Sequence, residues 1–402
     1  MAVDESYFAK ALGIDRSWKV DKVLLNEASG VTDLYVSAVR GGTFPCPVCG
    51  RECKVHDTYE RTWRDLDMGL TMCMVHAKVP RTDCPEHGVK QIEVPWAREY
   101  SRQTLNFERR CLDMIAEMPV NAVARTMRIS DDVLWGILYS FVEGARKNID
   151  MSRVRRIGID ETSCRRRHNY ITIFVDLDTR KVLFATVGRS SETVKEFVKD
   201  LIEHGGSPEN ITDVSCDMGG PFIKGITENL PKAHLTFDKF HVMQMANIAV
   251  ETVRKDMIKT KEEKTKWKIK NLLMYRRKHL SPAKAEKLDL FLKENETIGK
   301  AYILKEMLGD IYLMETKKEA EERFDLWVTF ASKAVHETMR ELAEHLAAHK
   351  EGILKWFDSR ISNGILEGIN SVIQGVKRMA RGYRLPENMI TMLYLRSSGI
   401  RL

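Results

Sequence analysis

The C-terminal stretch from residue 362 to 378 carries polar side chains at a spacing that suits chemistry. One face, at helical spacing, consists of Asn363, Glu367, Asn370, Gln374 and Arg378. Apolar residues fill the positions between them, which predicts an amphipathic helix. A solvated face is usually a mixture of Lys and Glu, whereas this one is mostly amides around one carboxylate. We therefore expect it to face a ligand; an ordinary surface helix is the alternative.

Two aspartates upstream follow apolar segments with the pattern of strands. Asp160 is expected to end the strand 156–160, and Asp217 the strand 211–217. Carboxylates at strand ends can meet at one rim of a sheet, where Glu367 could join them from a packed helix. Each Asp alone could equally be a turn or cap residue. Together the three would repel one another, and a divalent cation removes that conflict.

Hard oxygen ligands favour Mg²⁺ or Mn²⁺ over zinc. Two such ions can activate a water or a 3′-hydroxyl for in-line displacement at phosphorus. Asp238, which follows the next strand (233–237), is the alternative second ligand. We prefer Asp217, because its strand is expected beside that of Asp160. Asp238 and His241 would then support the site, although a packed histidine is equally consistent with the pattern. Asn363 and Asn370 are further supporting candidates.

A cysteine and histidine cluster near the N-terminus has metal-ligand spacing. Cys46 and Cys49 form a C-x2-C pair, and Cys84 and His87 form a C-x2-H pair. Two such pairs across a long intervening loop suit tetrahedral zinc in a small module with little core of its own. Four protein ligands leave no open position, so we expect structural Zn²⁺. A second ion is the alternative, with ligands from Cys53, His56, Cys73 and His76.

Positive charge is concentrated in one segment. The whole chain carries a net charge of +7, and residues 254–278 contain eleven Lys or Arg against three acidic residues. That segment is therefore +8 and the rest about −1, which favours a surface that binds a polyanion over a solvated helix. The residues that we expect to contact DNA are Lys264, Lys266, Lys268, Lys270, Arg276, Arg277, Lys377 and Arg378.

Residues 120–135 have the pattern of a helix, a tight turn and a second helix capped by Ser130. This predicts a helix-turn-helix. The second helix begins with Asp131 and Asp132 and is then mostly apolar, so base reading and a role in packing or dimerisation both stay open. Arg98 and Arg128 are among the arginines that could instead hold the DNA backbone.

The elements that must position these residues form a mixed α/β chain. Strands are expected between residues 18 and 40, helices over 104–148, then the order β-β-β-α-β-α-β, a long helical block and a final helix. We divide the chain into 1–97, 98–150, 151–243, 244–350 and 351–402. Neither a long apolar run nor a signal-like N-terminus occurs, which predicts a soluble, cytoplasmic protein without a membrane partner.

Several of these segments resemble the signature blocks of DDE transposases of the ISL3 insertion-sequence family. They are residues 158–161 (Gly-Ile-Asp-Glu), 217–218 (Asp-Met), 238–241 (Asp-Lys-Phe-His), 362–370 (Ser-Asn-Gly-Ile-Leu-Glu-Gly-Ile-Asn) and 377–384 (Lys-Arg-Met-Ala-Arg-Gly-Tyr-Arg). The resemblance covers nearly the whole chain. It implies an α/β ribonuclease H-like catalytic core with an all-α insertion, preceded by a zinc-binding module and a helix-turn-helix. It also implies a catalytic triad of Asp160, Asp217 and Glu367.

The function implied is a DNA transposase of the bacterial nucleoid. It would bind the terminal inverted repeats of its element, cleave there with Mg²⁺ or Mn²⁺, and join the 3′ ends to target DNA. A homodimer or higher oligomer on double-stranded DNA is expected. Two alternatives stay open. One is a zinc-finger and helix-turn-helix DNA-binding protein with an inactive core, and the other is a ribonuclease H-like nuclease that acts on structured nucleic acid.

Overall fold

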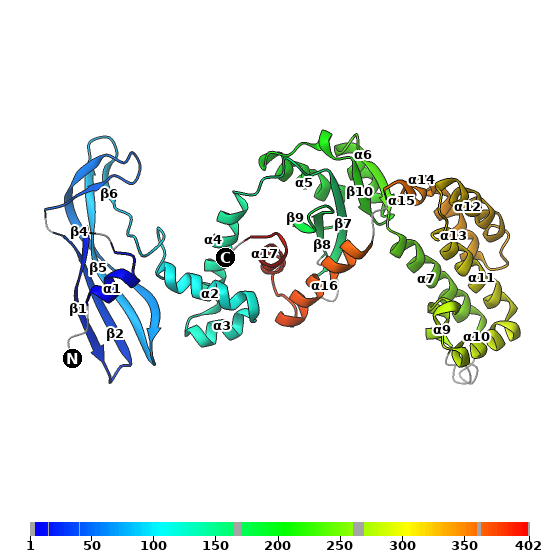
Figure 1. Cartoon of the computed structure of the whole chain (residues 1–402), viewed down its shortest axis with the longest axis horizontal. Coiled ribbons are helices and arrows are strands. Elements are labelled where there is room, and N and C mark those ends of the chain that lie inside the picture. Colours follow the sequence, from blue (N-terminus) through cyan, green and yellow to red (C-terminus); the bar gives the residue numbers. More distant parts are fainter. Residues whose placement is uncertain are drawn as a thin grey trace. The chain divides into compact units, whose positions relative to one another are not determined.

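The computed structural model describes residues 5–14, 16–39, 41–164, 170–259, 269–359 and 363–400, and leaves out the side chains of residues 5 and 363–367 (Figure 1). The chain divides into two compact units, Met1–Phe141 with Arg401–Leu402, and Val142–Ile400. Each unit is described by itself. No helix in the described ranges is both long enough and apolar enough to span a membrane.

The first unit is built on a six-stranded sheet. Its elements are α1 (Glu5–Ala11), β1 (Trp18–Asn26), β2 (Val31–Ala38), β3 (Thr43–Pro45), β4 (Glu52–Met68), β5 (Thr71–Cys84) and β6 (Gly88–Gln91). The strand order is β1-β2-β5-β4-β3, and β6 pairs with β5. The pairing is antiparallel throughout, except between β2 and β5. The expected strands between residues 18 and 40 are confirmed.

The long hairpin of β4 and β5 corrects one expectation. A long loop with little core is expected from the sequence between the two zinc-ligand pairs. This expectation is wrong, because paired strands occupy that segment. Residues of β4 and β5 alternate between the two faces of the sheet, and Trp63 lies opposite Val75 on the buried face. Leu34 and Trp96 complete this core. The hairpin therefore joins the zinc ligands to a sheet with a core of its own.

Three helices follow: α2 (Leu105–Glu117) and α3 (Val120–Met127) belong to the first unit, and α4 (Asp131–Arg146) begins in the first unit and ends in the second. Thr104 caps α2, because its hydroxyl accepts a hydrogen bond from the amide of Phe107 at 3.2 Å. Ser130 caps α4 through the amide of Val133 at 3.4 Å, as expected. The helices predicted over residues 104–148 are thus confirmed.

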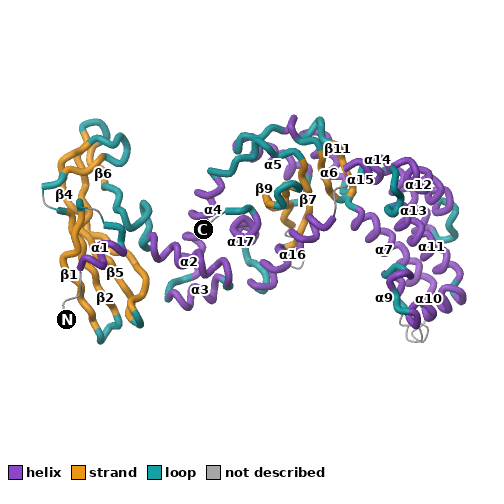
Figure 2. The backbone as a smooth tube through the Cα atoms, in the orientation of Figure 1, coloured by secondary structure: helices purple, strands orange, loops and turns teal. Residues whose placement is uncertain are grey.

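The second unit is built on a five-stranded sheet (Figure 2). Its strands are β7 (Arg156–Ser163), β8 (Tyr170–Asp176), β9 (Lys181–Val187), β10 (Asp213–Cys216) and β11 (His234–Phe237), in the order β11-β10-β7-β8-β9. Strand β8 is antiparallel to β7 and β9, whereas β10 is parallel to β7 and β11. The expected hairpin of β8 and β9 is confirmed.

Helices pack on the sheet of the second unit. They are α5 (Ser191–Glu203), α6 (Gly220–Asn229), α16 (Asn363–Ala380) and α17 (Pro386–Ser397), with a short 3₁₀ turn η1 (Pro208–Asn210). Phe197 of α5 stacks on Phe174 of β8 at 4.4 Å. The hydroxyl of Tyr394 in α17 accepts a hydrogen bond from the amide of Ala185 in β9 at 2.9 Å. Ser190 occupies the N-cap position of α5.

A helical block lies between β11 and α16, as predicted. Its described elements are α7 (Lys239–Met257), α9 (Lys270–Met274), η2 (Arg277–His279), α10 (Pro282–Glu294), α11 (Glu296–Ile311), α12 (Lys317–Ala331), α13 (Glu337–Ala348), α14 (Lys350–Leu354) and α15 (Trp356–Ser359). Phe237 of the sheet and Val242 of α7 share one hydrophobic cluster with Leu308 and Trp327. The block therefore packs as part of the second unit rather than as a separate body.

Candidate active site and zinc centre

The strand register of the second sheet brings three aspartates to one level. Ser215 pairs with Gly158, and Cys216 pairs with Phe237. Continuing these registers sets Asp217 level with Asp160 on one side and with Asp238 on the other. Neighbouring strands lie about 4.8 Å apart, so Asp217 adjoins both, whereas Asp238 is two strands away from Asp160. The strand adjacency expected from the sequence is confirmed.

Asp160 does not end its strand, and this expectation is wrong. Strand β7 continues to Ser163 because β8 pairs with it, with Asp160 opposite Ile173. On its other side, pairing with β10 stops at Gly158. Asp160 therefore lies just beyond the parallel half of the sheet, at the carboxyl end where sites of such sheets are built.

The carboxylate of Asp160 is held by two donors. Its Oδ1 accepts a hydrogen bond from the amide of Glu161 at 2.7 Å, and its Oδ2 accepts one from Nδ2 of Asn370 at 2.6 Å. Burial raises the pKa of Asp160, and the charge of Asp217 adds to the rise. The hydrogen bonds from Asn370 and Glu161 and the charge of His241 oppose it. Residues from β7, from the loop after β10 and from the helices α7 and α16 thus act on a single carboxylate.

Glu161 belongs to the same group of carboxylates, although the sequence interpretation gave it no role. Burial raises the pKa of Glu161, and the charges of Asp217 and Asp160 raise it further. Arg189 and His241 act in the opposite direction. Adjacent strand residues point to opposite faces, so the Asp-Glu pair alone did not suggest a shared site. No local signal in the sequence reveals its place in the group, because Asp217, Arg189 and His241, whose charges act on Glu161, lie far along the chain.

The other two aspartates of the row are bound into local turns. Oδ1 of Asp217 accepts a hydrogen bond from the amide of Gly219 at 3.0 Å, where the chain enters α6. Asp238 is buried and caps α7, because its Oδ1 accepts a bond from the amide of Phe240 at 2.9 Å. Nδ1 of His241 lies 3.9 Å from Oδ2 of Asp238. Asp238 therefore has a structural role that Asp217 does not share.

Helix α16 runs along β7, on the side of Asp160. Asn370 reaches Asp160, and Nζ of Lys377 donates to the hydroxyl of Thr162 at 2.6 Å. Asp160 and Thr162 share a face of the strand, and Asn370 and Lys377 are two helical turns apart. Burial lowers the pKa of Lys377. The polar face of this helix meets a carboxylate at Asn370. The side chains of Asn363 and Glu367 lie outside the described ones, so their places in the site stay a prediction.

We predict that Asn370→Leu shifts the pH dependence of any reaction that needs ionised Asp160. The amide of Asn370 lowers the pKa of Asp160, so its loss should raise that pKa further. The acidic limb of the cleavage rate profile should then move to higher pH. Gln374→Leu is the control, because Gln374 is exposed one turn along the same helix. Equal profiles for both variants would contradict this role of Asn370.

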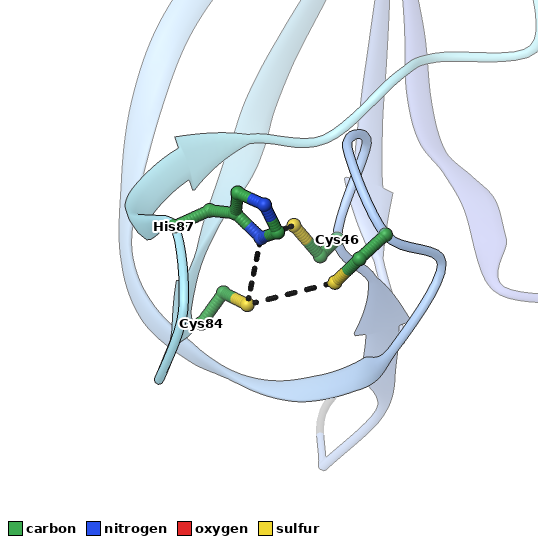
Figure 3. Close-up of side chains that lie close together, drawn as sticks. Cys46, Cys84 and His87 are labelled. Atoms are coloured by element: carbon green, nitrogen blue, oxygen red, sulfur yellow. Dashed lines mark hydrogen bonds between the residues drawn. The ribbon is translucent and has the colours of Figure 1, made fainter.

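The zinc-ligand candidates meet at the end of the first sheet. Cys46, Cys84 and His87 point toward one another in Figure 3. The distance from Sγ of Cys84 to Sγ of Cys49 is 3.8 Å and to Nδ1 of His87 is 3.5 Å, and Sγ of Cys46 lies 3.9 Å from Nδ1 of His87. Tetrahedral zinc with Zn–S bonds of about 2.3 Å needs sulfur atoms about 3.8 Å apart. The donor set therefore fits one structural Zn²⁺, as predicted.

Backbone N–H groups in the two turns at this centre favour the thiolates of Cys46 and Cys84. Backbone N–H groups of Glu86 and His87 contribute to lowering the pKa of Cys84 to about 7. Backbone N–H groups of Cys49 and Val48 lower the pKa of Cys46 in the same way. The pKa of Cys49 is raised: the backbone N–H of Arg51 lowers it, but burial and the neighbouring Cys84 and Cys46 outweigh that effect. Hydrogen bonds to sulfur favour the thiolate, which is the form that binds zinc.

A second metal ion finds no support among the described residues. There, the cluster of Cys46, Cys49, Cys84 and His87 is the only group of three or more such ligands with all ligating atoms within 4.8 Å of one another. Cys73 lies in the sheet core, where burial raises its pKa to about 12. Nε2 of His76 lies 2.7 Å from Oδ1 of Asp33. Cys53 is buried beside the cluster and donates to the carbonyl of Arg51 at 3.3 Å.

The helix-turn-helix pattern has a tight turn at Arg128. This residue adopts a left-handed backbone with φ of 55°, where a glycine is often found. Its guanidinium bonds to Asp67 and, at 3.4 Å, to the carbonyl of Leu70, so it ties the turn to the β4–β5 hairpin. Arg98 binds Glu108 through two hydrogen bonds of 2.6 and 2.8 Å. Both arginines thus bind groups of the first unit. Their contact with the DNA backbone, the other role considered from the sequence, stays a prediction.

The candidate DNA contacts fall into three groups. Lys264, Lys266 and Lys268 lie outside the described residues, and Lys270 begins α9. Arg276 pairs with Asp310, and Arg277 forms hydrogen bonds of 2.8 and 2.6 Å with Asp289. Arg378 is exposed on α16, whereas Lys377 is turned toward β7.

A zinc centre, a helix-turn-helix and an α/β core with carboxylates at the carboxyl ends of its strands define a DNA-binding protein of the transposase class. Comparison with known protein families gives the same class for each of three segments of the chain. Residues 157–393 match the transposase domain of family ISL3, residues 92–142 match the helix-turn-helix domain of that family, and residues 42–87 match the zinc finger of transposases IS204, IS1001, IS1096 and IS1165. The chain belongs to the ISL3 family of transposases.

Similar proteins span almost the full length of the chain. The transposase for insertion sequence element IS1557 of Mycobacterium tuberculosis is 27% identical over 427 residues, which cover 98% of this chain and 96% of that protein. The transposase for insertion sequence element IS1001 of Bordetella parapertussis is 26% identical over 387 residues, covering 93% of this chain and 94% of that protein.

Proposed function

We propose that this transposase binds the terminal inverted repeats of its own insertion sequence and catalyses metal-dependent strand cleavage and strand transfer. The observation that carries the proposal is that Asp160 of β7 and Asp217, just after the neighbouring strand β10, lie at one level of the sheet, with Asn370 of α16 bonded to Asp160. Glu367 precedes Asn370 by three residues, so the two positions share one face of the helix. A third carboxylate would therefore come from α16.

The core is proposed to be ribonuclease H-like. Its support is a mixed sheet in which an antiparallel β7–β8–β9 meander continues into the parallel strands β10 and β11. The boundaries that we propose are 1–97 for the zinc-finger module, 98–150 for the helix-turn-helix, 151–243 for the first part of the core, 244–350 for the insertion and 351–402 for the completing helix and tail.

The metal at this core is proposed to be Mg²⁺ or Mn²⁺, held by Asp160, Asp217 and Glu367. Mutual repulsion helps to raise the pKa of Asp160, as expected of a donor set that awaits a cation, and carboxylate oxygens are the ligands these ions prefer. When bound, such ions activate a hydroxyl or water and neutralise the leaving oxygen. Asn370 would hold Asp160 in place, with Asp238, His241 and Asn363 in supporting roles.

Different segments are proposed to recognise the DNA sequence and to hold the DNA backbone. The zinc finger and helix-turn-helix would recognise the terminal repeats, and the basic segment with Lys377 and Arg378 would hold the backbone of terminal or target DNA. A dimer or higher oligomer in the nucleoid would bring two ends together. The test is a joining assay with pre-cut terminal DNA: a transposase joins it to target DNA, whereas a nuclease for structured nucleic acid only cuts.

We predict that neutralising Lys264, Lys266, Lys268 and Lys270 together weakens binding to DNA of every sequence. Each lost phosphate contact should flatten the dependence of log K on log salt by up to about 0.9. Binding titrations between low and moderate salt measure the slope. The control replaces Lys317, Lys350 and Lys355 by Gln, since these lysines already pair with acidic residues. An unchanged slope in the quadruple variant would mean that the segment is a solvated face.

A further inference from the structure

A groove on the first unit runs between the zinc centre and the start of the helix-turn-helix. Two cavities of about 510 and 600 Å³ share three lining residues, Tyr59, Arg61 and Tyr100. Val48 of the first zinc turn lines one end, and Arg102, just before α2, lines the other. The groove therefore joins the two segments that match DNA-binding domains.

Two tyrosine rings of this groove are left in solvent. Tyr59 is 58% exposed and Tyr100 is 85% exposed. A single exposed aromatic residue is common on protein surfaces and needs no explanation. Two of them in one groove form an aromatic surface of the kind on which the flat face of a nucleobase stacks.

The backbone at Tyr100 is held in a left-handed conformation, with φ of 58°. This conformation is unfavourable for a residue with a side chain, so its surroundings must impose it. Arg61 donates to the carbonyl of Ser101 at 3.0 Å, and the hydroxyl of Ser101 donates to Glu108 at 2.8 Å. Glu108 is itself held by Arg98. A rigid frame thus presents the ring of Tyr100 to the groove.

Cationic side chains accompany the rings. Lys90 and Arg102 are exposed, and neither has an acidic partner among the described residues. The guanidinium of Arg61 lies over the ring of Trp63, 4.9 Å from its centroid, and keeps its positive charge at the groove. Glu60, Glu93 and Glu99 also line the groove, so its positive charge is moderate and suits a short segment of DNA backbone.

We propose that this groove binds an unpaired stretch of a DNA strand, with bases on Tyr59 and Tyr100 and phosphates at Lys90 and Arg102. Inside a duplex each base face is covered by its neighbours, so a protein ring can stack only on a base that has left the helix. Cavities of roughly 300–1,000 Å³ hold a small molecule, about the size of one or two nucleotides. The inference depends on DNA binding and not on cleavage.

The test uses the full-length zinc-bound chain without added Mg²⁺ or Mn²⁺. The variant is Tyr59→Thr with Tyr100→Asn, because threonine suits a strand and asparagine tolerates a left-handed backbone. The probes are a labelled 20-nucleotide oligothymidylate and a 20-base-pair duplex. We expect the variant to lose at least ~10-fold in affinity for the oligothymidylate and less than ~2-fold for the duplex.

Tyr7→Ala is the matched control, since Tyr7 is 66% exposed on α1 and does not line the groove. Zinc content and the unfolding temperature verify that each variant is folded. An independent measurement uses Lys90→Gln with Arg102→Gln, which should reduce the salt slope for oligothymidylate by ~1.4 if two phosphate contacts are lost. Equal losses on both probes, or none on oligothymidylate, would overturn the proposal. Because no cleavage is measured, failure of strand transfer would leave this result unaffected.

Discussion

Asp160→Asn, Asp217→Asn and Glu367→Gln are each expected to abolish strand cleavage and strand transfer while DNA binding persists. An amide keeps the shape of the side chain but removes the negative charge that attracts a divalent cation. Asp160 and Asp217 come from adjacent strands at one level of the sheet, so both can reach one ion. Binding should survive because it depends on the DNA-binding domains and basic residues elsewhere.

Asp238→Asn should retain measurable activity. The activity should fall by about 10- to 100-fold if Asp238 orients the metal ligands without binding the ion itself. Its register lies one strand further from Asp160, and its carboxylate already caps α7. Asp213→Asn is the matched control. Asp213 begins β10, at the end of the strand opposite to Asp217, which follows Cys216, so this variant should cleave normally.

Cleavage assays on pre-bound terminal DNA, in Mg²⁺ and in Mn²⁺, measure these effects. Activity in Asp217→Asn together with inactivity in Asp238→Asn would reverse the assignment of the second ligand. If all variants bind DNA but even the unaltered chain fails to nick it with either ion, the DNA-binding protein with an inactive core becomes the better description.

Cys46→Ser should lose zinc and unfold the zinc centre while the second unit stays folded. Hydroxyl oxygen is a poor zinc ligand, and three remaining donors cannot close the tetrahedral site. The turns that carry Cys49 and His87 are held together by the ion, so their folding is coupled to its binding. The hydrophobic cluster of the second unit contains no residue of this centre.

Metal analysis of the purified chain measures the first effect, and thermal unfolding measures the second. One zinc per chain is expected before substitution and none after it. Cys111→Ala is the control, because Cys111 is buried in α2 of the same unit and lies outside the cluster. Full zinc occupancy in Cys46→Ser would refute the ligand assignment.

The sequence alone determined those features that short-range spacing encodes. The two pairs at Cys46 and Cys84 specify zinc ligands because each pair closes a tight turn by itself. Two apolar segments and the short turn between them indicate the strands β8 and β9. The amide-rich face of α16 could be predicted because residues three or four positions apart lie on the same face of a helix.

Only the tertiary structure decided features that depend on a distant partner. How far β7 extends past Asp160 is set by its pairing with β8, and no local signal marks that point. Glu161 belongs to the group of carboxylates because Asp217, far along the chain, lies near it. Arg128 stabilises the helix-turn-helix turn because Asp67, 61 residues before it, accepts its hydrogen bond. The β4–β5 hairpin follows the same rule, since its strands are stabilised by each other and by the core that they cover. Spacing therefore specified which residues carry chemistry, whereas strand pairing and packing determined which of them meet.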